Sequence, residues 1–332
     1  MVSPEVTVVV VPRERFDRTR ASLDRLYQTT RCPFDLVYID GNSPPPVARY
    51  LAAEADRRGF ALHRTKSYLA GNEARNIGLR YARTPYVAFI ENDVLPEPGW
   101  LEALTDCAER TGAWIVGPIV HIGLGAERRI HGAGAAISIA ESGGRRRLVY
   151  QARLANAPTA AAAGLTAHRT DLIKPYCMLA RRGALDRIGP FDQSIRSIFE
   201  AADVALAVQA AGGTVHLEPR AVVTHTVPPP LPASSVPFFL LRWSVAWLRT
   251  SLERFAGKHR LPLDAPELHI EHNWRSYHRR RVLPAPLFAL LRRHPFLYVA
   301  KAVDRAVFDL LLEQTVVRRL ERRRADAGFP SS

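Results

Sequence analysis

The chain has 332 residues, 47% of them hydrophobic, and a formal net charge of +14 at pH 7. This size provides a sizeable core and allows two domains, or one large α/β domain with an extension. No run of 18 apolar residues occurs, so no membrane-spanning helix is expected. The N-terminal MVSPEVTVVVVP lacks a basic leader, so no signal peptide is expected. The three cysteines are widely spaced, which favours a reduced compartment.

The first 117 residues alternate apolar runs with segments of helical spacing. The predicted strands are Val6–Val11, Asp35–Ile39, Phe60–His63, Tyr86–Ile90 and Ala113–Gly117. The predicted helices between them begin near Asp17, after the prolines that follow Ser43, at Gly71 and at Trp100. Such short alternation predicts an α/β fold in which a mostly parallel sheet is covered by helices on both faces.

Polar residues follow three of these strands at the point where each strand ends. They are Pro12–Arg15, Asp40–Ser43 and Glu91–Asp93. The C-terminal ends of parallel strands meet at one edge of a sheet, so we expect the three segments to converge on a ligand site. The two carboxylates of the last segment are two residues apart, which places both on one face of an extended strand and lets them converge on one cation. Taken alone, this segment is equally compatible with a solvated turn.

Beyond Gly117 the alternation stops. Glycine-rich turns within His121–Tyr150 predict a hairpin, and the alanine-rich Ala155–Leu165 predicts a loop. The remaining predicted strands and helices are Tyr176–Ala180, a short helix from Arg181, a helix over Phe199–Ala211, and strands Thr214–Leu217 and Ala221–Thr224.

A proline-rich boundary separates residues 1–228 from a C-terminal extension, residues 236–332. The extension carries 18 Lys and Arg against 9 Asp and Glu, a net +9 of the total +14. Its predicted amphipathic basic helices are Phe238–Phe255, Leu287–Ala300 and Val303–Arg324. Two interpretations of their apolar faces remain open: docking on the catalytic core, or peripheral contact with a membrane surface.

The order of motifs between Val6 and Pro228 resembles family 2 glycosyltransferases of GT-A fold. The segments that carry the resemblance are VTVVVVP, VYIDGNS, GNEARNIGL, VAFIENDVLPEPGWL, CMLARRGALDRIGPFD, EAADVAL and VVTH. The resemblance implies a Rossmann-like, mostly parallel sheet with a C-terminal helical extension. It also implies transfer of a sugar from a nucleotide-diphospho-sugar donor to a hydroxyl of a glycan, lipid-linked or small-molecule acceptor.

The chemistry of such a donor explains the carboxylates. Breaking the sugar–phosphate bond builds negative charge on the diphosphate, which a divalent cation such as Mn²⁺ or Mg²⁺ stabilises through oxygen ligands. The segment Glu91-Asn92-Asp93 stands where the family has its Asp-any-Asp motif. The resemblance therefore implies that Asp93 and His225 bind the metal, and that Glu91 reaches the ribose or the metal.

The resemblance also implies a set of donor contacts. The implied donor-binding residues are Pro12, Asp40, Arg75, Asn76, Glu91 and Asn92. Asp40 would accept a hydrogen bond from a uracil-like N–H, and Arg75 would pair with the diphosphate, with Asp93 or with Asp40. Relatives have Thr-Tyr-Asn or similar after the proline, whereas this chain has Arg13-Glu14-Arg15, which leaves the contacts of that loop open.

An acceptor hydroxyl needs a general base opposite the leaving group. The family takes it from a Glu-Asp-any-Asp motif, which here reads Glu200-Ala201-Ala202-Asp203, so the usual base aligns with Ala201. Asp203 is the first candidate for the base and Glu200 the second, since the two share one helical face. Direct displacement in this geometry implies inversion at the anomeric carbon. The gap at Ala201 also allows an inactive site.

Together these expectations describe a metal-dependent, inverting glycosyltransferase of the cytoplasm, with the basic helices holding it at the inner face of the membrane under the second interpretation above. The alternative is a non-catalytic, degenerate glycosyltransferase-fold protein that binds a membrane surface or a partner enzyme. The basic tail also raises nucleic-acid binding, but no recognition motif accompanies it, so no nucleic-acid partner is expected.

Overall fold

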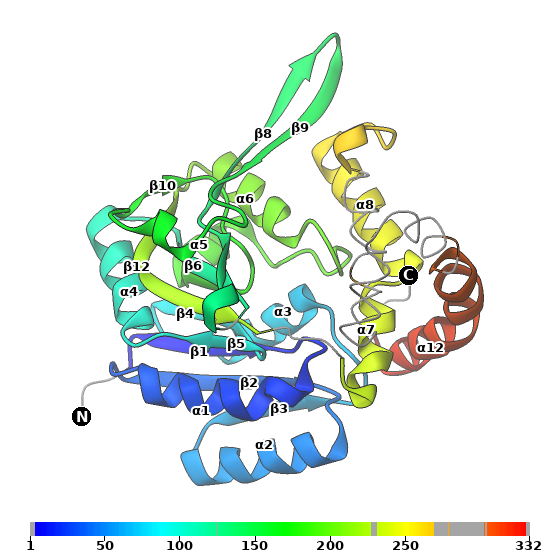
Figure 1. The fold of residues 1–332 in the computed structure, drawn as a ribbon, viewed down its shortest axis with the longest axis horizontal. Coiled ribbons are helices and arrows are strands. Elements are labelled where there is room, and N and C mark those ends of the chain that lie inside the picture. The colour runs from blue at the N-terminus through cyan, green and yellow to red at the C-terminus, as the bar shows by residue number, and fades with distance from the viewer. Residues whose placement is uncertain are drawn as a thin grey trace.

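The computed structural model describes residues 4–123, 125–226, 231–268, 278, 302 and 304–329. Within them the chain forms one ten-stranded mixed sheet flanked by helices, a separate two-stranded hairpin, and a group of C-terminal helices (Figure 1). The predicted helix Leu287–Ala300 lies outside the described residues. None of the described helices is long and apolar enough to cross a membrane.

The elements follow one another in the predicted α/β order. The strands are β1 (Val6–Val11), β2 (Phe34–Gly41), β3 (Ala61–Thr65), β4 (Tyr86–Glu91), β5 (Val94–Pro96), β6 (Ile115–Ile122), β7 (Arg129–Gly132), β8 (Ala135–Ser142), β9 (Arg145–Ala152), β10 (His168–Thr170), β11 (Cys177–Arg181) and β12 (Val215–His225). The α-helices are α1 (Thr19–Thr29), α2 (Pro45–Arg58), α3 (Gly71–Tyr81), α4 (Trp100–Thr111), α5 (Arg182–Ile188), α6 (Glu200–Ala210), α7 (Val236–Arg242), α8 (Val245–His259) and α12 (Arg318–Asp326). The other helical segments are η1 (Phe16–Arg18), η2 (Gly125–Glu127), η3 (Thr159–Ala162), η4 (Ala233–Ser235) and the π-helical η5 (Asp304–Val317).

The main path of the sheet runs β10-β12-β6-β11-β4-β1-β2-β3. The neighbours of β1 are both parallel to it, with Val9 opposite Val37 on β2 and opposite Phe89 on β4. This confirms that the ends of β1, β2 and β4 share one edge. Strand β11 is antiparallel to both β4 and β6, so its N-terminal end lies at that same edge.

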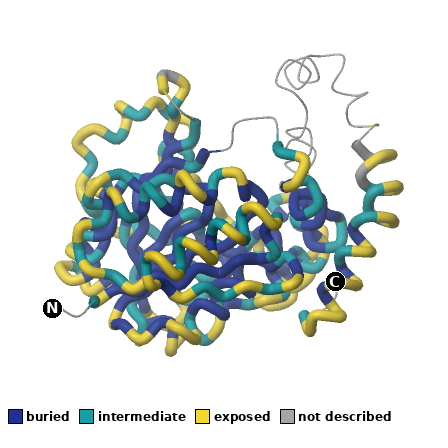
Figure 2. The backbone as a smooth tube through the Cα atoms, turned by 90° about the horizontal axis from the view of Figure 1, so that it is seen from below, coloured by how far each residue is buried: buried dark blue, intermediate teal, exposed yellow. Residues whose placement is uncertain are grey.

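Alternation along β1 divides the core between the two faces of the sheet. Val8 and Val10 pack in the cluster that includes Leu23 of α1 and Trp100 of α4. Val9 and Val11 pack in the cluster that includes Ile77 of α3. Because both faces are covered, the strands need no polar side, and Figure 2 shows them as a buried centre with the exposed segments around it.

Two local predictions were wrong. Thr214–Leu217 and Ala221–Thr224 belong to one strand, β12, because a register shift between Glu218 and Val222 keeps both halves paired with β6. The expected helix Phe238–Phe255 is two helices, α7 and α8. Ser244 separates them, since it has an extended backbone and its side chain accepts a hydrogen bond from the Trp247 N–H at 3.1 Å.

The described part of the C-terminal extension packs on the rest of the chain rather than apart from it. Phe238, Leu241 and Trp247 share a buried cluster with Phe16 and Ala70. Aromatic rings stack across this contact, with the ring centroids of Tyr68 and Phe238 4.9 Å apart and the ring planes nearly parallel. The docking interpretation of these helices therefore holds for α7 and α8.

Helix α12 is fixed to the start of α3 by a buried ion pair. Arg324 Nη2 lies 2.6 Å from Glu73 Oε1, and both side chains are 1% exposed. The guanidinium also lies over the ring of Trp247, 4.8 Å from its centroid. Glu73 in turn accepts a hydrogen bond from the Ala70 N–H at 2.8 Å, which caps α3.

Breaking this pair should destabilise the whole protein. Arg324→Ala leaves the Glu73 carboxylate buried without its partner, so we expect the free energy of unfolding to fall by about 3 kcal/mol in urea titrations monitored by circular dichroism. Arg322→Ala, on the exposed face of the same helix, is the matched control and should leave the midpoint unchanged. Equal stability of the two variants would show that α12 is not docked as described.

Candidate functional site

The ends of β1 and β4 are joined by Asn92. Its backbone N–H donates to the Val11 carbonyl at 3.1 Å, and its side-chain Oδ1 accepts from the Arg13 N–H at 2.7 Å. These two bonds place the loop that begins at Pro12 beside Glu91 and Asp93. In this structure the Asn92 side chain is thus occupied in holding the loop.

Strand β12 brings His225 to the same place. Its last residue pairs with Val94 of β5, and the His225 Nε2 lies 3.3 Å from Asp93 Oδ2. Ligand atoms of Glu91, Asp93 and His225 all lie within 4.8 Å of one another, and the three side chains are 1%, 2% and 12% exposed, respectively. Residues 91, 93 and 225 therefore form one cluster, which we call the acidic triad.

The acidic triad has unused polar atoms that suit a cation. Within the described chain, Asp93 Oδ1 and His225 Nδ1 are buried and have no hydrogen-bond partner. Buried polar atoms in folded proteins are rarely left without a partner, so a missing ligand is a natural explanation. Two carboxylates and an imidazole form a donor set that accepts Mn²⁺ or Mg²⁺ together with phosphate oxygens and water.

A second cluster adjoins the acidic triad through Glu91. Arg13 Nη2 lies 2.6 Å from Glu91 Oε1 and 2.9 Å from Glu200 Oε2. Arg75 lies further from the same two carboxylates, 3.9 Å from Glu91 and 3.6 Å from Glu200. We call these four side chains the ionic cluster. Its most exposed member, Glu200, is only 5% exposed.

The ionic cluster keeps Glu200 ionised. Burial alone would raise the pKa of Glu200, but the Arg13 and Arg75 guanidiniums outweigh burial and hold the pKa below its usual value. Sequence reasoning did not identify Arg13 as a site residue. The sequence feature that could have identified Arg13 is its position just after β1, a strand that ends at the expected edge of the sheet.

Asp203 has different partners from Glu200, although both lie in the first turn of α6. Its carboxylate lies 2.8 Å from Lys258 Nζ and 2.8 Å from His259 Nε2, both in the last turn of α8. Burial would raise the pKa of Asp203, whereas the hydrogen bonds from His259 and Lys258 lower it, and the lowering prevails. The predicted shared helical face therefore does not give the two carboxylates a shared environment.

Asp40 lies at the predicted edge, and both of its oxygens are in use. Oδ1 accepts from the Ser43 N–H at 2.8 Å, while Oδ2 accepts from the Ser43 hydroxyl at 3.0 Å and contacts Arg64. Arg64 is 39% exposed, so a bound base could replace it without disturbing the core.

Two other predicted donor residues contact protein groups. Asn76 exchanges two hydrogen bonds with the backbone of Phe191, at 2.8 and 3.0 Å, which ties α3 to the segment before α6. Arg75 donates to Asn72 Oδ1 at 3.0 Å and to the Pro175 carbonyl at 3.2 Å. In the described chain its ion pairs are with Glu91 and Glu200, not with Asp93 or Asp40.

The aromatic ring of Tyr176 packs beside His225, a contact that was not predicted from the sequence. The Tyr176 ring lies 4.4 Å from the His225 ring, and its hydroxyl lies 3.0 Å from His131 Nε2. Burial, reinforced by Glu91, raises the pKa of Tyr176. Tyr176 directly precedes β11, and only the antiparallel direction of that strand brings it to the edge where the parallel strands end.

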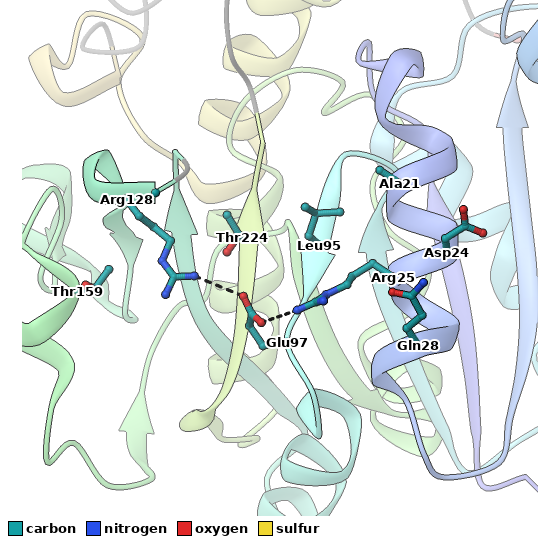
Figure 3. Close-up of a pocket in the computed structure, with 10 residues that line it drawn as sticks. Ala21, Asp24, Arg25, Gln28, Leu95, Glu97, Arg128, Thr159 and Thr224 are labelled. Carbon is teal, nitrogen blue, oxygen red and sulfur yellow. Dashed lines mark hydrogen bonds and ion pairs between the residues drawn. The ribbon is translucent and has the colours of Figure 1, made fainter.

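An open cavity of about 720 Å³ lies elsewhere. It is lined by residues of α1, β5 and β12, among them Leu95 and Thr224, but by none of the predicted site residues. Figure 3 shows Glu97 between two arginines, 2.7 Å from Arg25 and 3.4 Å from Arg128. Since Thr224 and His225 are successive strand residues, they point to opposite faces, and this cavity is separate from the acidic triad.

Comparison with known sequences finds relatives among sugar transferases. Residues 7–189 match the sequence profile of Glycosyl transferase family 2. Two curated relatives, from Mycobacterium tuberculosis strains CDC 1551 / Oshkosh and ATCC 25618 / H37Rv, are each named pre-mycofactocin glycosyltransferase. Each is 28% identical over 224 residues, which cover 67% of this chain and 42% of the relative. The chain thus spans less than half the length of these relatives.

Comparison with solved structures supports the fold. A crystal structure of GalNAc-T7 with UDP, GalNAc and Mn²⁺ superimposes with a TM-score of 0.50 and 15% sequence identity. The superposition covers 81% of this chain and 55% of the other. At this identity the likeness concerns the fold alone, and it confirms the predicted GT-A architecture.

The contacts of Asp203 lead to a stability test. We expect Asp203→Asn to lower the free energy of unfolding at pH 7 by about 2 kcal/mol, less than for a fully buried pair because Lys258 is one-third exposed. The lowered pKa of Asp203 means that this contribution is present above the unfolded pKa of about 3.9 and is lost as the pH falls below it.

The difference between wild type and Asp203→Asn should therefore shrink in urea titrations below about pH 4. Glu253→Gln, which removes an exposed partner of Arg249 on α8, is the control and should leave stability unchanged. A difference that stays constant down to pH 3 would contradict the assigned ion pairs.

Proposed function

The chain belongs to glycosyl transferase family 2, whose profile covers more than half of it, and from this we propose that it transfers a sugar from a nucleotide-diphospho-sugar donor to an acceptor hydroxyl. The observation that carries the proposal is the acidic triad. It places two carboxylates and an imidazole, with unpartnered buried atoms, at the edge where parallel strands end.

We propose that Asp93 and His225 bind a divalent cation, with Glu91 beside them. When bound, such an ion supplies a Lewis acid that stabilises the charge of the departing diphosphate. The formal charges fit this role. The charges of Arg13 and Arg75 offset those of Glu91 and Glu200. The carboxylate of Asp93 then gives the site a net charge of −1, which attracts a cation before the anionic donor arrives.

Arg13 has a positioning role in this proposal. It is charge-paired with Glu91 at 2.6 Å, so Glu91 is held in one orientation next to Asp93. Asn92 fixes the Arg13 backbone and thereby the loop after Pro12, which lines the proposed donor site. Asp40 can then contact the base of the donor when that base replaces the exposed Arg64.

For the general base we propose Glu200 ahead of Asp203. Both carboxylates have basic partners, but Glu200 belongs to the ionic cluster next to the acidic triad, whereas the partners of Asp203 are Lys258 and His259 of α8, outside that cluster. An ionised carboxylate at the start of α6 can accept the proton of the acceptor hydroxyl as the hydroxyl attacks. Attack from the face opposite the diphosphate inverts the anomeric configuration.

The comparisons suggest which ligands to try first. The superimposed GalNAc-T7 structure contains UDP and Mn²⁺, and the sequence relatives are named as glycosyltransferases. We therefore propose a UDP-sugar as donor and a glycan or lipid-linked hydroxyl as acceptor. We also propose that residues 1–228 form the catalytic domain and that residues 236–332 form a helical extension completing it.

A thermal-shift panel tests the donor site. The purified chain is heated with UDP, GDP, ADP and UDP-sugars, each with and without Mn²⁺. A nucleotide at about 100 times its Kd should add about 2.7 kcal/mol of stability, and we expect that gain only when Mn²⁺ is present. Asp93→Asn should abolish the Mn²⁺-dependent gain, whereas Asp24→Asn, which changes a side chain of α1 that is 41% exposed, should keep it. No shift with any nucleotide would overturn the proposal and favour the non-catalytic alternative.

Measuring kcat distinguishes between Glu200 and Asp203 as the general base. With a donor from the panel, we expect Glu200→Gln to reduce kcat at least 100-fold while nucleotide binding is retained, in the range of a lost general base. Asp203→Asn, assayed well below its melting temperature, should reduce kcat less than tenfold. NMR of the product gives the anomeric configuration, which should be inverted. Undiminished transfer by Glu200→Gln would refute its role as base.

A further inference from the structure

One continuous stripe of exposed residues runs along η5 and α12. Exposure recurs every four residues, first at 306 and 307 and last at 322 and 323. The exposed residues of the stripe are Ala306, Val307, Leu310, Leu311, Gln314, Thr315, Arg318, Arg319, Arg322 and Arg323. Residues four apart lie on one helical face, so the stripe is one surface. In Figure 1 these helices, coloured red, lie at the outer edge of the molecule, beyond α7 and α8.

The stripe is apolar at one end and cationic at the other. Leu310 and Leu311 are each 58% exposed and Val307 is 38% exposed, which places three of the exposed large hydrophobic residues of the described chain on one element. Two turns later the same face carries four arginines.

The acidic residues of these helices mostly turn inward. The Glu313 carboxylate accepts hydrogen bonds from the Val245 and Ala246 N–H groups at 3.0 and 2.8 Å, where it caps α8. Glu321 accepts a bond from Trp247 Nε1 at 2.6 Å. Of the acidic residues with described burial between 309 and 326, only Asp326 is exposed. The outer face therefore keeps nearly the full charge of its arginines.

We propose that this stripe docks on an anionic lipid surface, with the leucines entering the headgroup region and the arginines contacting phosphate. An interfacial helix has this combination of an apolar part and a basic part. Charge complementarity favours lipid over the protein's own core, since four adjacent arginines would be costly to bury. The two exposed leucines also favour lipid over nucleic acid, because a phosphate backbone has no apolar region in which they could be buried.

The stripe has a fixed position relative to the candidate site. The inner face of α12 holds the first turn of α3 through Arg324 and Glu73. Arg242 of α7, which packs beside η5 and α12, makes two hydrogen bonds of 2.8 and 2.9 Å to Glu14 in the loop after β1. A bilayer along the stripe would therefore lie beside the end of the sheet that carries the acidic triad.

Vesicle co-sedimentation tests the proposal, in the absence of donor and metal so that its outcome is independent of transferase activity. The full chain is mixed with neutral phosphatidylcholine vesicles or with vesicles containing 30% phosphatidylglycerol, at about 0.1 M salt. We expect binding to the anionic vesicles only. Replacing Arg318, Arg319, Arg322 and Arg323 by Gln should weaken that binding at least about tenfold, since each surface arginine contributes about fivefold before screening.

A matched control separates the stripe from the general basicity of the chain. Replacing Arg31, Arg57, Arg80 and Arg83 by Gln removes the same charge from other exposed positions and should change binding less than threefold. Leu310→Ser with Leu311→Ser should also weaken binding, about tenfold, although no charge is lost. Melting temperatures of all variants should match the wild type.

Three results would overturn the proposal: no binding to anionic vesicles, equal losses in the two arginine variants, or no loss in the leucine variant. Fluorescence anisotropy with a duplex DNA of random sequence tests the competing proposal that the stripe binds nucleic acid. Salt-sensitive DNA binding that depends on the four stripe arginines, without vesicle binding, would assign the surface to nucleic acid instead.

Discussion

The structure depends on the pairing of four buried charges. Arg13 and Arg75 face Glu91 and Glu200, which come from the end of β1, from α3, from the end of β4 and from the start of α6. An unpaired buried charge costs several kcal/mol, so all four elements must meet for any one of them to be stable there. The space is correspondingly tight, since a Cβ added to Gly71 would lie 2.7 Å from Glu200 Oε1. The ionic cluster thus fixes the elements around the acidic triad without the help of a ligand.

The C-terminal helices extend this network outward. Arg242 pairs with Glu14, next to Arg13, and Arg324 pairs with Glu73 in the first turn of the helix that carries Arg75. Both contacts fix a segment that lines the candidate site, and both come from the extension. The division at residue 228 that the sequence predicts is therefore a boundary of composition, while packing and electrostatics continue across it.

The sequence predicted the sheet edge well because strand periodicity and strand ends are local properties. Glu91, Asp93 and His225 were expected to meet, and they do. Glu91 and Asp93 end or follow a strand whose direction the α/β alternation implies, whereas His225 was expected there from the resemblance. Arg13, Tyr176 and the partners of Asp203 were missed for a common reason. Their roles depend on side chains far away in the chain, 187 residues for Arg13 with Glu200, and no spacing rule reports such contacts. The break at Ser244 was missed similarly, because Glu313 completes the cap from another helix.

The pairing of Arg324 with Glu73 also bears on how the protein is made. The two residues are 251 positions apart, so when a ribosome has finished α3, the partner of Glu73 has not yet been synthesised. At 5–20 residues per second, roughly 12–50 seconds pass before Arg324 is added. During that interval the first turn of α3 carries an unmatched carboxylate at a place that is later buried. The sheet can form early, but the region around the candidate site reaches its final form only after Arg324 has been synthesised.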